Sequence, residues 1–141
     1  MTIQTVAHLN FRGNARDVLA FYHSVFGGNQ ILMTWAQAYG TTDPTQTDMI
    51  AWGQVQSEDG FHLMAYDVPL DRAWNPGETP FFVALNGTDT TTLTDYWDGL
   101  AVDATIIHPL APAGFSPLYG MLKDRFGITW VMSVMPDHNP A

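Results

Sequence analysis

One pattern occurs twice in this sequence and strongly limits the folds it can adopt: a strand, an amphipathic helix and three more strands. The first copy spans residues 3–67 and the second spans residues 80–135. Residues 68–79 lie between them and hold two prolines and a glycine, which predicts a linker. Such a unit leaves one face of its sheet uncovered by the helix, so two units can curl these faces into a shared concave cleft. We therefore expect one α+β domain of two βαβββ units over residues 1–141, with a curved mixed sheet.

Local signals place the elements of this pattern. Two helices are expected, at about 15–26 after the N-cap Asn14 and at about 90–100 after Thr88 or Asp89. Alternating and β-branched runs predict strands at 3–11, 29–35, 48–56, 61–67, 80–87 and 103–109, and turn-rich composition predicts loops at 36–47 and 111–114.

The first helix carries an apolar stripe, because its large side chains recur at steps of three and four residues. Phe21, Tyr22 and Phe26 belong to this stripe and are predicted to lie in the core. Truncating Phe21 to alanine is therefore expected to lower the free energy of unfolding by roughly 3–5 kcal/mol.

The stretch at 115–134 is predicted to close the second sheet as a hairpin. Two apolar runs rich in aromatic and β-branched residues flank the polar sequence KDRFG at 123–127. Gly127 supplies the positive φ that a tight connection between two strands needs.

Side-chain alternation divides the first strand between two faces of its sheet. Leu9 and Phe11 share the face that suits the helix, whereas His8 and Asn10 share the other. We expect His8 and Asn10 to face the cleft, because a slip of one residue would reverse the whole assignment.

Charge and composition exclude several classes of function. The chain has five Lys and Arg against fourteen Asp and Glu, a formal net charge of −9, which argues against a nucleic-acid-binding surface. Its first residues lack the basic and apolar regions of a signal peptide, and no apolar run reaches the ~18 residues of a membrane span. There is no cysteine, as is common in a reducing compartment. We expect a cytoplasmic protein with no membrane or nucleic-acid partner.

Three stretches carry a resemblance to a known family. They are LNFRGNAR at 9–16 with FY at 21–22 and VFGG at 25–28, then GFHLMAYD at 60–67, then YGM at 119–121 with Asp124, FG at 126–127 and Trp130. Their order and spacing resemble the vicinal oxygen chelate superfamily, which includes glyoxalase I, bleomycin-resistance proteins and extradiol dioxygenases. Within it the chain resembles the PhnB-like branch. Such proteins have been labelled ubiquinone-type methyltransferases, but no Gly-rich nucleotide loop follows a strand here.

The resemblance also implies where a metal would bind, since metal-using relatives place one His or Glu on the first and fourth strands of each half. His8 is the candidate on the first strand, and His62 and Asp67 are the candidates on the fourth. The fifth strand offers no ligand, and Trp130 and its neighbours stand where the eighth would carry Glu. At most two of four positions are filled, so we expect no complete metal site and no cofactor, and a His8 that is hydrogen-bonded rather than metal-bound.

Without a metal, His8 and Asp67 could form an acid–base pair, because imidazole titrates near neutral pH and a carboxylate can orient it. Asp67 could instead cap the turn before Val68. The remaining candidates for a ligand site are either pocket walls and polar contacts or plain core residues: Asn10, Trp35, Trp52, His62, Tyr66, Tyr119 and Trp130.

These observations favour a protein that binds a small apolar or aromatic molecule in its cleft. The alternatives are a lyase, isomerase or dioxygenase that uses His8 with a metal or with Asp67, and a regulatory module that binds a partner. We also expect a homodimer, because the edge strands of the sheets expose backbone groups and many relatives are two-fold dimers.

Overall fold

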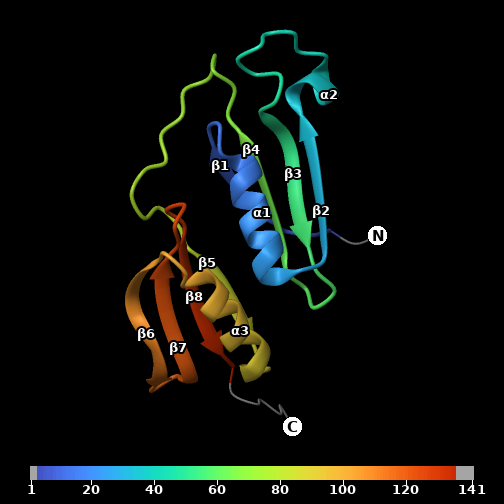
Figure 1. Cartoon of the computed structure of the whole chain (residues 1–141). Helices are drawn as coiled ribbons and strands as arrows, with labels where there is room; N and C mark the ends of the chain where they lie inside the picture. Colours follow the sequence, from blue (N-terminus) through green and yellow to red (C-terminus); the bar gives the residue numbers. More distant parts are fainter. Residues whose placement is uncertain (1–2, 136–141) are drawn as a thin grey trace. The chain divides into compact units, whose positions relative to one another are not determined.

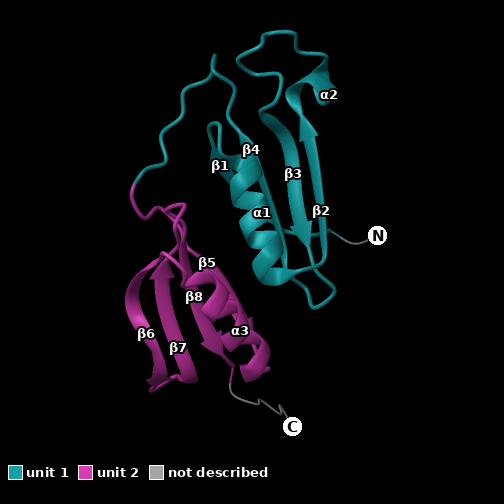
Figure 2. Cartoon of the chain, in the orientation of Figure 1, with its two compact units in different colours: residues 1–77 teal, residues 78–141 magenta. Residues whose placement is uncertain are grey.

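The computed structural model describes residues 3–135 (Figure 1). The chain divides after Gly77 into two compact units, the first ending at residue 77 and the second beginning at residue 78 (Figure 2). This division falls inside the segment 68–79 whose prolines and glycine predict a linker.

The first unit is a four-stranded sheet with one long helix on one face (Figure 1). The strand order is β1-β4-β3-β2, with β1 and β4 parallel and the other pairs antiparallel. Its elements are β1 (Ala7–Phe11), α1 (Ala15–Phe26), β2 (Asn29–Thr34), α2 (Trp35–Tyr39), β3 (Ile50–Gln56) and β4 (His62–Asp67).

The second unit repeats the same topology. Its strand order is β5-β8-β7-β6, and again the first and fourth strands of the unit are parallel. Its elements are β5 (Val83–Gly87), α3 (Thr90–Leu100), β6 (Thr105–Ala113), β7 (Ser116–Lys123) and β8 (Thr129–Val134). The predicted α+β class and the repeated βαβββ order are therefore confirmed.

The core of the first unit lies between α1 and the sheet. Leu19 and Tyr22 on the helix are fully buried, and Phe26 stacks on Phe61 with ring centroids 3.7 Å apart. At Gly53 of β3 an added Cβ would lie 2.4 Å from Leu19 Cδ1, so the Leu19 side chain packs directly against the backbone of the sheet there. Phe21, predicted to be a core residue, is only half-buried, because it lies at the margin of the helix stripe.

The two faces of β1 are divided as the alternation predicts. Leu9 and Phe11 are buried at 1% and 4% exposure, whereas His8 and Asn10 are exposed. The same alternation continues in β4, where Leu63, Ala65 and Asp67 are buried and the residues between them are half-buried.

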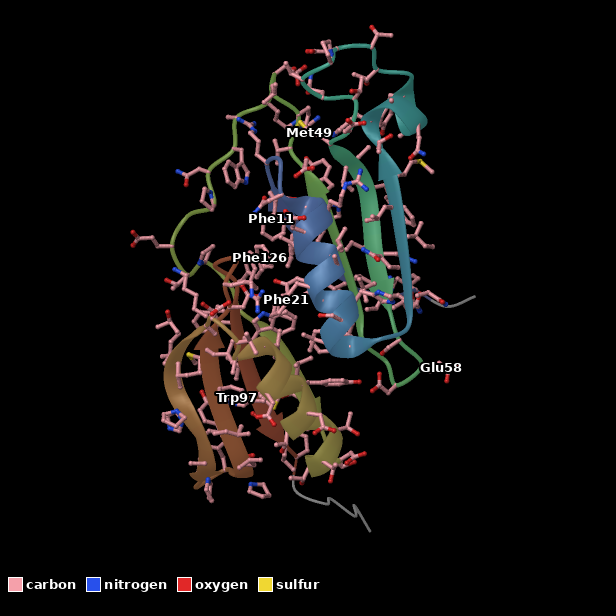
Figure 3. All side chains as sticks on the ribbon, viewed as in Figure 1. Phe11, Phe21, Met49, Glu58, Trp97 and Phe126 are labelled. Atoms are coloured by element: carbon pink, nitrogen blue, oxygen red, sulfur yellow. The ribbon has the colours of Figure 1, made fainter. Side chains whose placement is uncertain are left out.

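The core of the second unit lies between α3 and its sheet. Trp97 projects from α3 towards β7 (Figure 3), where an added Cβ at Gly120 would lie 2.8 Å from the Trp97 ring. Trp130, Met132 and Val134 of β8 are all buried on this side.

The predicted closing hairpin is confirmed as β7 and β8, with Gly127 at φ 89° in the connection. Asp124 organises this turn from a buried position. Its Oδ1 accepts hydrogen bonds from the backbone N–H groups of Phe126 and Ile128, and its Oδ2 accepts one from Trp130 Nε1 at 2.9 Å.

The strands predicted at 3–11 and 80–87 begin only at Ala7 and Val83, and two segments predicted as loops contain regular structure. The polar stretch predicted as a loop contains the C-terminal part of α2, a short helix that begins with a capping box between Thr34 and Gln37. Residues 111–113, predicted as a loop, extend β6 to Ala113, because the register shifts along β6 let the strand continue past its prolines.

Candidate functional site

The sheet face of the first unit opposite α1 is called the open face below. It carries alternate residues of each strand, and most of its large side chains are half-buried or exposed. Its members are Asn10 and His8 from β1, Ile31 and Met33 from β2, Trp52 and Gln54 from β3, and His62, Met64 and Tyr66 from β4. Since the core of the unit lies on the α1 side, these side chains are available for other contacts.

His8 is oriented by two neighbours on the open face. Its Nδ1 lies 3.1 Å from Asn10 Oδ1, and its ring meets the Tyr66 ring edge-on with centroids 4.9 Å apart. An amide carbonyl oxygen accepts hydrogen bonds, so the His8 ring donates from Nδ1 in this contact and Nε2 takes no part in it.

Tyr66 joins an aromatic row to a guanidinium group. Arg72 Nη1 donates a hydrogen bond of 3.1 Å to the Tyr66 hydroxyl oxygen. On the other side, Trp35 lies 6.3 Å from Tyr66 and stacks on Tyr39, with a centroid distance of 5.2 Å. The indole Nε1 of Trp35 donates to the backbone oxygen of Asp67, which fixes the ring at the end of β4.

The loop after β4 is fastened to the end of β1 by Arg12. Its guanidinium donates hydrogen bonds to the backbone oxygens of Val68, at 3.3 Å, and Pro69, at 3.1 Å, and to that of Arg72. It also lies over the Trp74 ring, 5.8 Å from the ring centroid.

Trp74 closes this attachment, because its Nε1 donates to the backbone oxygen of Asn10 at 3.3 Å. The segment that the sequence marks as a linker thus folds back on the strand that carries His8.

The expected acid–base pair of His8 and Asp67 is not assembled. Asp67 is 2% exposed and points to the α1 side, whereas His8 lies on the open face. The Asp67 carboxylate accepts three backbone hydrogen bonds, from Gly13 at 2.7 Å, Ala15 at 3.0 Å and Ile50 at 2.8 Å. It caps the first turn of α1 and the start of β3, and not the turn before Val68.

The other candidates of the first unit, Trp52 and His62, are half-buried and lie on the open face. His62 Nε2 lies 3.0 Å from Gln54 Oε1 of the neighbouring strand. Trp52 precedes Gly53, whose cross-strand partner is Ala65, so the indole belongs to the part of the sheet that carries Tyr66.

In the second unit, Tyr119 lies on the sheet face opposite α3 within an aromatic group. Its ring is edge-on to His108, at 5.1 Å, and to Phe115, at 4.9 Å. Trp130 does not lie on this face: it is 1% exposed on the α3 side and its Nε1 donates to Asp124, as the core alternative for this residue predicts.

Within residues 3–135, no three His, Cys, Asp or Glu side chains are grouped as a metal ion would require. His8 has an amide and a phenol as neighbours, and the buried carboxylate of β4 faces the other way. Of the candidates that the resemblance implies for the first unit, His8 and His62 lie on the open face and Asp67 does not.

Sequence reasoning missed Arg12, Arg72 and Trp74. Arg72 and Trp74 lie in the predicted linker. For the two arginines, the signal that could have indicated a role is the rarity of basic residues, of which the chain has five.

None of the helices in the described part of the chain is long and apolar enough to cross a membrane.

Comparison with solved structures gives relatives over nearly the whole chain. Protein PA1353 from Pseudomonas aeruginosa is 26% identical, with a TM-score of 0.83, and the match covers 96% of this chain and 100% of that one. A PhnB protein from Bacillus cereus is 19% identical, with a TM-score of 0.71 and coverage of 93% and 98%. A glyoxalase-related enzyme from Fulvimarina pelagi is 18% identical, with a TM-score of 0.59 and coverage of 93% and 88%.

The last two likenesses show a shared fold. A comparison with curated proteins found no match. The family model described as 3-demethylubiquinone-9 3-methyltransferase matches residues 3–133, which is nearly all of the described chain. The chain therefore belongs to the family that this model describes, and its repeated βαβββ fold is shared with the PhnB protein and the glyoxalase-related enzyme.

Proposed function

We propose that this protein binds a small planar or apolar molecule on the open face of its first unit. The observation that carries the proposal is the aromatic row of His8, Tyr66 and Trp35, which lies outside the α1 core and remains partly exposed. Ligand sites in proteins are mostly apolar and aromatic, with a few polar groups that orient the ligand. Here Asn10 and His62 supply such groups beside the aromatic rings.

Exposure of apolar side chains supports the same surface. Ile31 and Met33 of β2 are 43% and 40% exposed on the open face. A planar ligand that covers them together with Trp52 would remove apolar surface from water, at about 25 cal/mol per Å².

A neutral probe tests this proposal. Naphthalene-2-carboxamide is expected to bind in equilibrium dialysis and to shift the amide NMR signals of β1, β3 and β4. Trp52→Ala is expected to weaken binding about three- to tenfold, because an aromatic contact is lost. Phe81→Ala removes an exposed ring in the second unit and serves as the matched control. Binding that leaves the open-face signals and the Trp52 variant unchanged would contradict the proposal.

One observation favours a second function, that of a lyase, isomerase or dioxygenase. The His8 ring uses Nδ1 in its contact with Asn10, which leaves Nε2 on the open face as the ring nitrogen available for proton transfer. Asp67 has no part in this alternative, because its buried carboxylate faces the α1 side. Once a ligand is identified, His8→Ala is expected to abolish turnover and retain binding if the protein is an enzyme; unchanged turnover would remove His8 from any mechanism.

A further inference from the structure

We infer that the end of the open face where β1 and β4 finish binds an anionic group of the ligand, a carboxylate or enolate attached to a planar molecule. The inference rests on the proposed function, since it names the chemistry of the molecule that the open face would take. The contacts that carry it are those of Arg72 and Tyr66.

Basic side chains are scarce in this chain, so the place of each is informative. Of the five, Arg125 pairs with Asp103 at 3.8 Å and Arg16 donates to the backbone oxygen of Asp48. Within residues 3–135, no carboxylate forms an ion pair with the Arg12 or Arg72 guanidinium.

Arg72 retains most of its donors. Its side chain is exposed, and Nη1 donates to the Tyr66 hydroxyl oxygen. A guanidinium has five N–H donors in a planar fork, so the remaining ones can bind a carboxylate, which accepts two parallel hydrogen bonds.

The Tyr66 hydroxyl is made a donor by the same contact. Because its oxygen accepts from Arg72, its own proton is free to be donated to a ligand. Two adjacent donors of this kind, one of them charged, are the arrangement that recognises an oxyanion.

The backbone of the loop that carries Arg72 is held in place by hydrogen bonds. The backbone oxygen of Arg72 accepts from Arg12, which also binds the backbone oxygen of Pro69. Trp74 ties the far side of the loop to Asn10. This attachment fixes the loop before any ligand arrives, which lowers the entropy lost on binding.

The planar part of the ligand is indicated by what lies beside this anion site. From Tyr66 the aromatic surface continues through Trp35 to Tyr39. A molecule whose carboxylate meets Arg72 would thus lay its apolar body along these rings. The formal charge of −9 opposes anions in general, but at physiological salt charges more than ~8 Å away are largely screened, so the nearby guanidinium groups dominate.

The experiment compares two probes with the same ring, naphthalene-2-carboxylate and naphthalene-2-carboxamide, in equilibrium dialysis against the full chain. The carboxylate is expected to bind about tenfold more tightly, as a charge-assisted hydrogen bond allows. Arg72→Gln is expected to remove this advantage and to leave carboxamide affinity unchanged. Arg125→Gln makes the same change in net charge and is expected to alter neither affinity.

Salt and stability provide the remaining readouts. Raising the salt concentration is expected to weaken carboxylate binding to the native protein, with a much smaller effect on the Arg72→Gln variant. Arg72 is exposed, so this variant is expected to melt at the native temperature, and Arg72→Lys retains the charge as a second test.

The outcomes separate this inference from the proposed function. Equal affinities for the two probes, unaffected by Arg72→Gln, would overturn the anion site and leave the planar-ligand proposal standing. An equal loss of carboxylate affinity in the Arg72 and Arg125 variants would also overturn it, because net charge would then be the cause. If neither probe binds, both proposals fail.

Discussion

Asp67 and Ile50 are joined by a hydrogen bond of 2.8 Å from the backbone N–H of Ile50 to Oδ2 of Asp67, which fixes the start of β3 to the end of β4. The other carboxylate oxygen accepts from Gly13 and Ala15 at the start of α1. Asp67→Ala would leave these donors without an acceptor, and each buried donor so stranded costs about 1–3 kcal/mol. We expect this variant to lower the free energy of unfolding by about 3–5 kcal/mol in urea melts.

Asp71→Ala is the control for the Asp67 variant, because Asp71 is exposed in the following loop. It is expected to change stability by less than about 0.5 kcal/mol. Similar losses in the two variants would show that the buried hydrogen bonds of Asp67 do not stabilise the first unit.

The contact between Trp97 and Gly120 predicts an overpacking effect in the second unit. A Cβ at position 120 would lie 2.8 Å from the indole ring, so Gly120→Ala must displace the ring or the strand. We expect a loss of about 1–3 kcal/mol in the free energy of unfolding. Gly114→Ala, where an added Cβ meets nothing within 4 Å, is the matched control and should be nearly neutral. Equal melting temperatures would rule out the tight contact.

Neighbouring aromatic residues of α1 are expected to differ in their contribution to stability. Tyr22 is fully buried, so Tyr22→Ala should lower the free energy of unfolding by about 3–5 kcal/mol. Phe21 is half-buried, and Phe21→Ala should cost less than that range, contrary to the expectation from the sequence alone. Denaturant melts of the two variants would test the order; a larger loss for Phe21 would contradict it.

The stabilisation of helix α3 by its N-cap residue, Asp89, is expected to depend on pH. The Thr92 hydroxyl and backbone N–H donate to Asp89, and these bonds lower the pKa of the Asp89 carboxyl below its ordinary value of 3.8. The ionised form is thus favoured in the folded state, so its stabilisation is present above the unfolded pKa and disappears as pH falls through the folded pKa. Asp89→Ala should lower the melting temperature at pH 7 and have little effect near pH 2.

Asp89→Asn separates the cap from its charge, because an amide oxygen can still accept from Thr92. At pH 7 its melting temperature should be close to that of the native protein. At low pH it should not show the loss of stability that protonation of Asp89 causes. A carboxyl NMR titration with a midpoint at or above 3.8 would contradict the bonded cap.

We propose a homodimer, as the edge strands suggest. Strand β6 lies at the edge of the second sheet, and its Ile106 and Ile107 are 44% and 53% exposed. Unpaired edges with exposed apolar side chains favour association. Sedimentation equilibrium should give twice 15.6 kDa, and Ile107→Lys should shift the equilibrium towards the monomer, while Val102→Lys should not. A mass of 15.6 kDa for the native protein at micromolar concentration would exclude the dimer.

Period-two alternation explains what the sequence could predict about the open face. It separated His8 and Asn10 from Leu9 and Phe11, because a strand with one buried face leaves no other register. In β8 the same alternation puts Trp130 on one face with Met132, and both side chains are buried.

The remaining misses depend on long-range backbone contacts, which leave no local pattern. The Asp67 carboxylate accepts hydrogen bonds from backbone N–H groups that lie 17 to 54 positions away in the chain. Its sequence neighbours therefore do not indicate its role. Arg12 holds a loop about 60 positions further along, again through backbone oxygens. Backbone acceptors are the same for every residue type, and no residue in that loop could therefore indicate the attachment.

In each unit the last strand made during synthesis takes an inner position in the sheet, β4 between β1 and β3 and β8 between β5 and β7. A nascent chain can form α1 and the β2–β3 hairpin early, but β1 has no partner until β4 has left the ribosome. The parallel pairing then closes a loop of more than 50 residues, a slow kind of step. Because the repeat is complete at the end of β4, the first unit can finish folding while the second is still being translated. In each unit the sheet can therefore form only after its last strand, β4 or β8, has been synthesised.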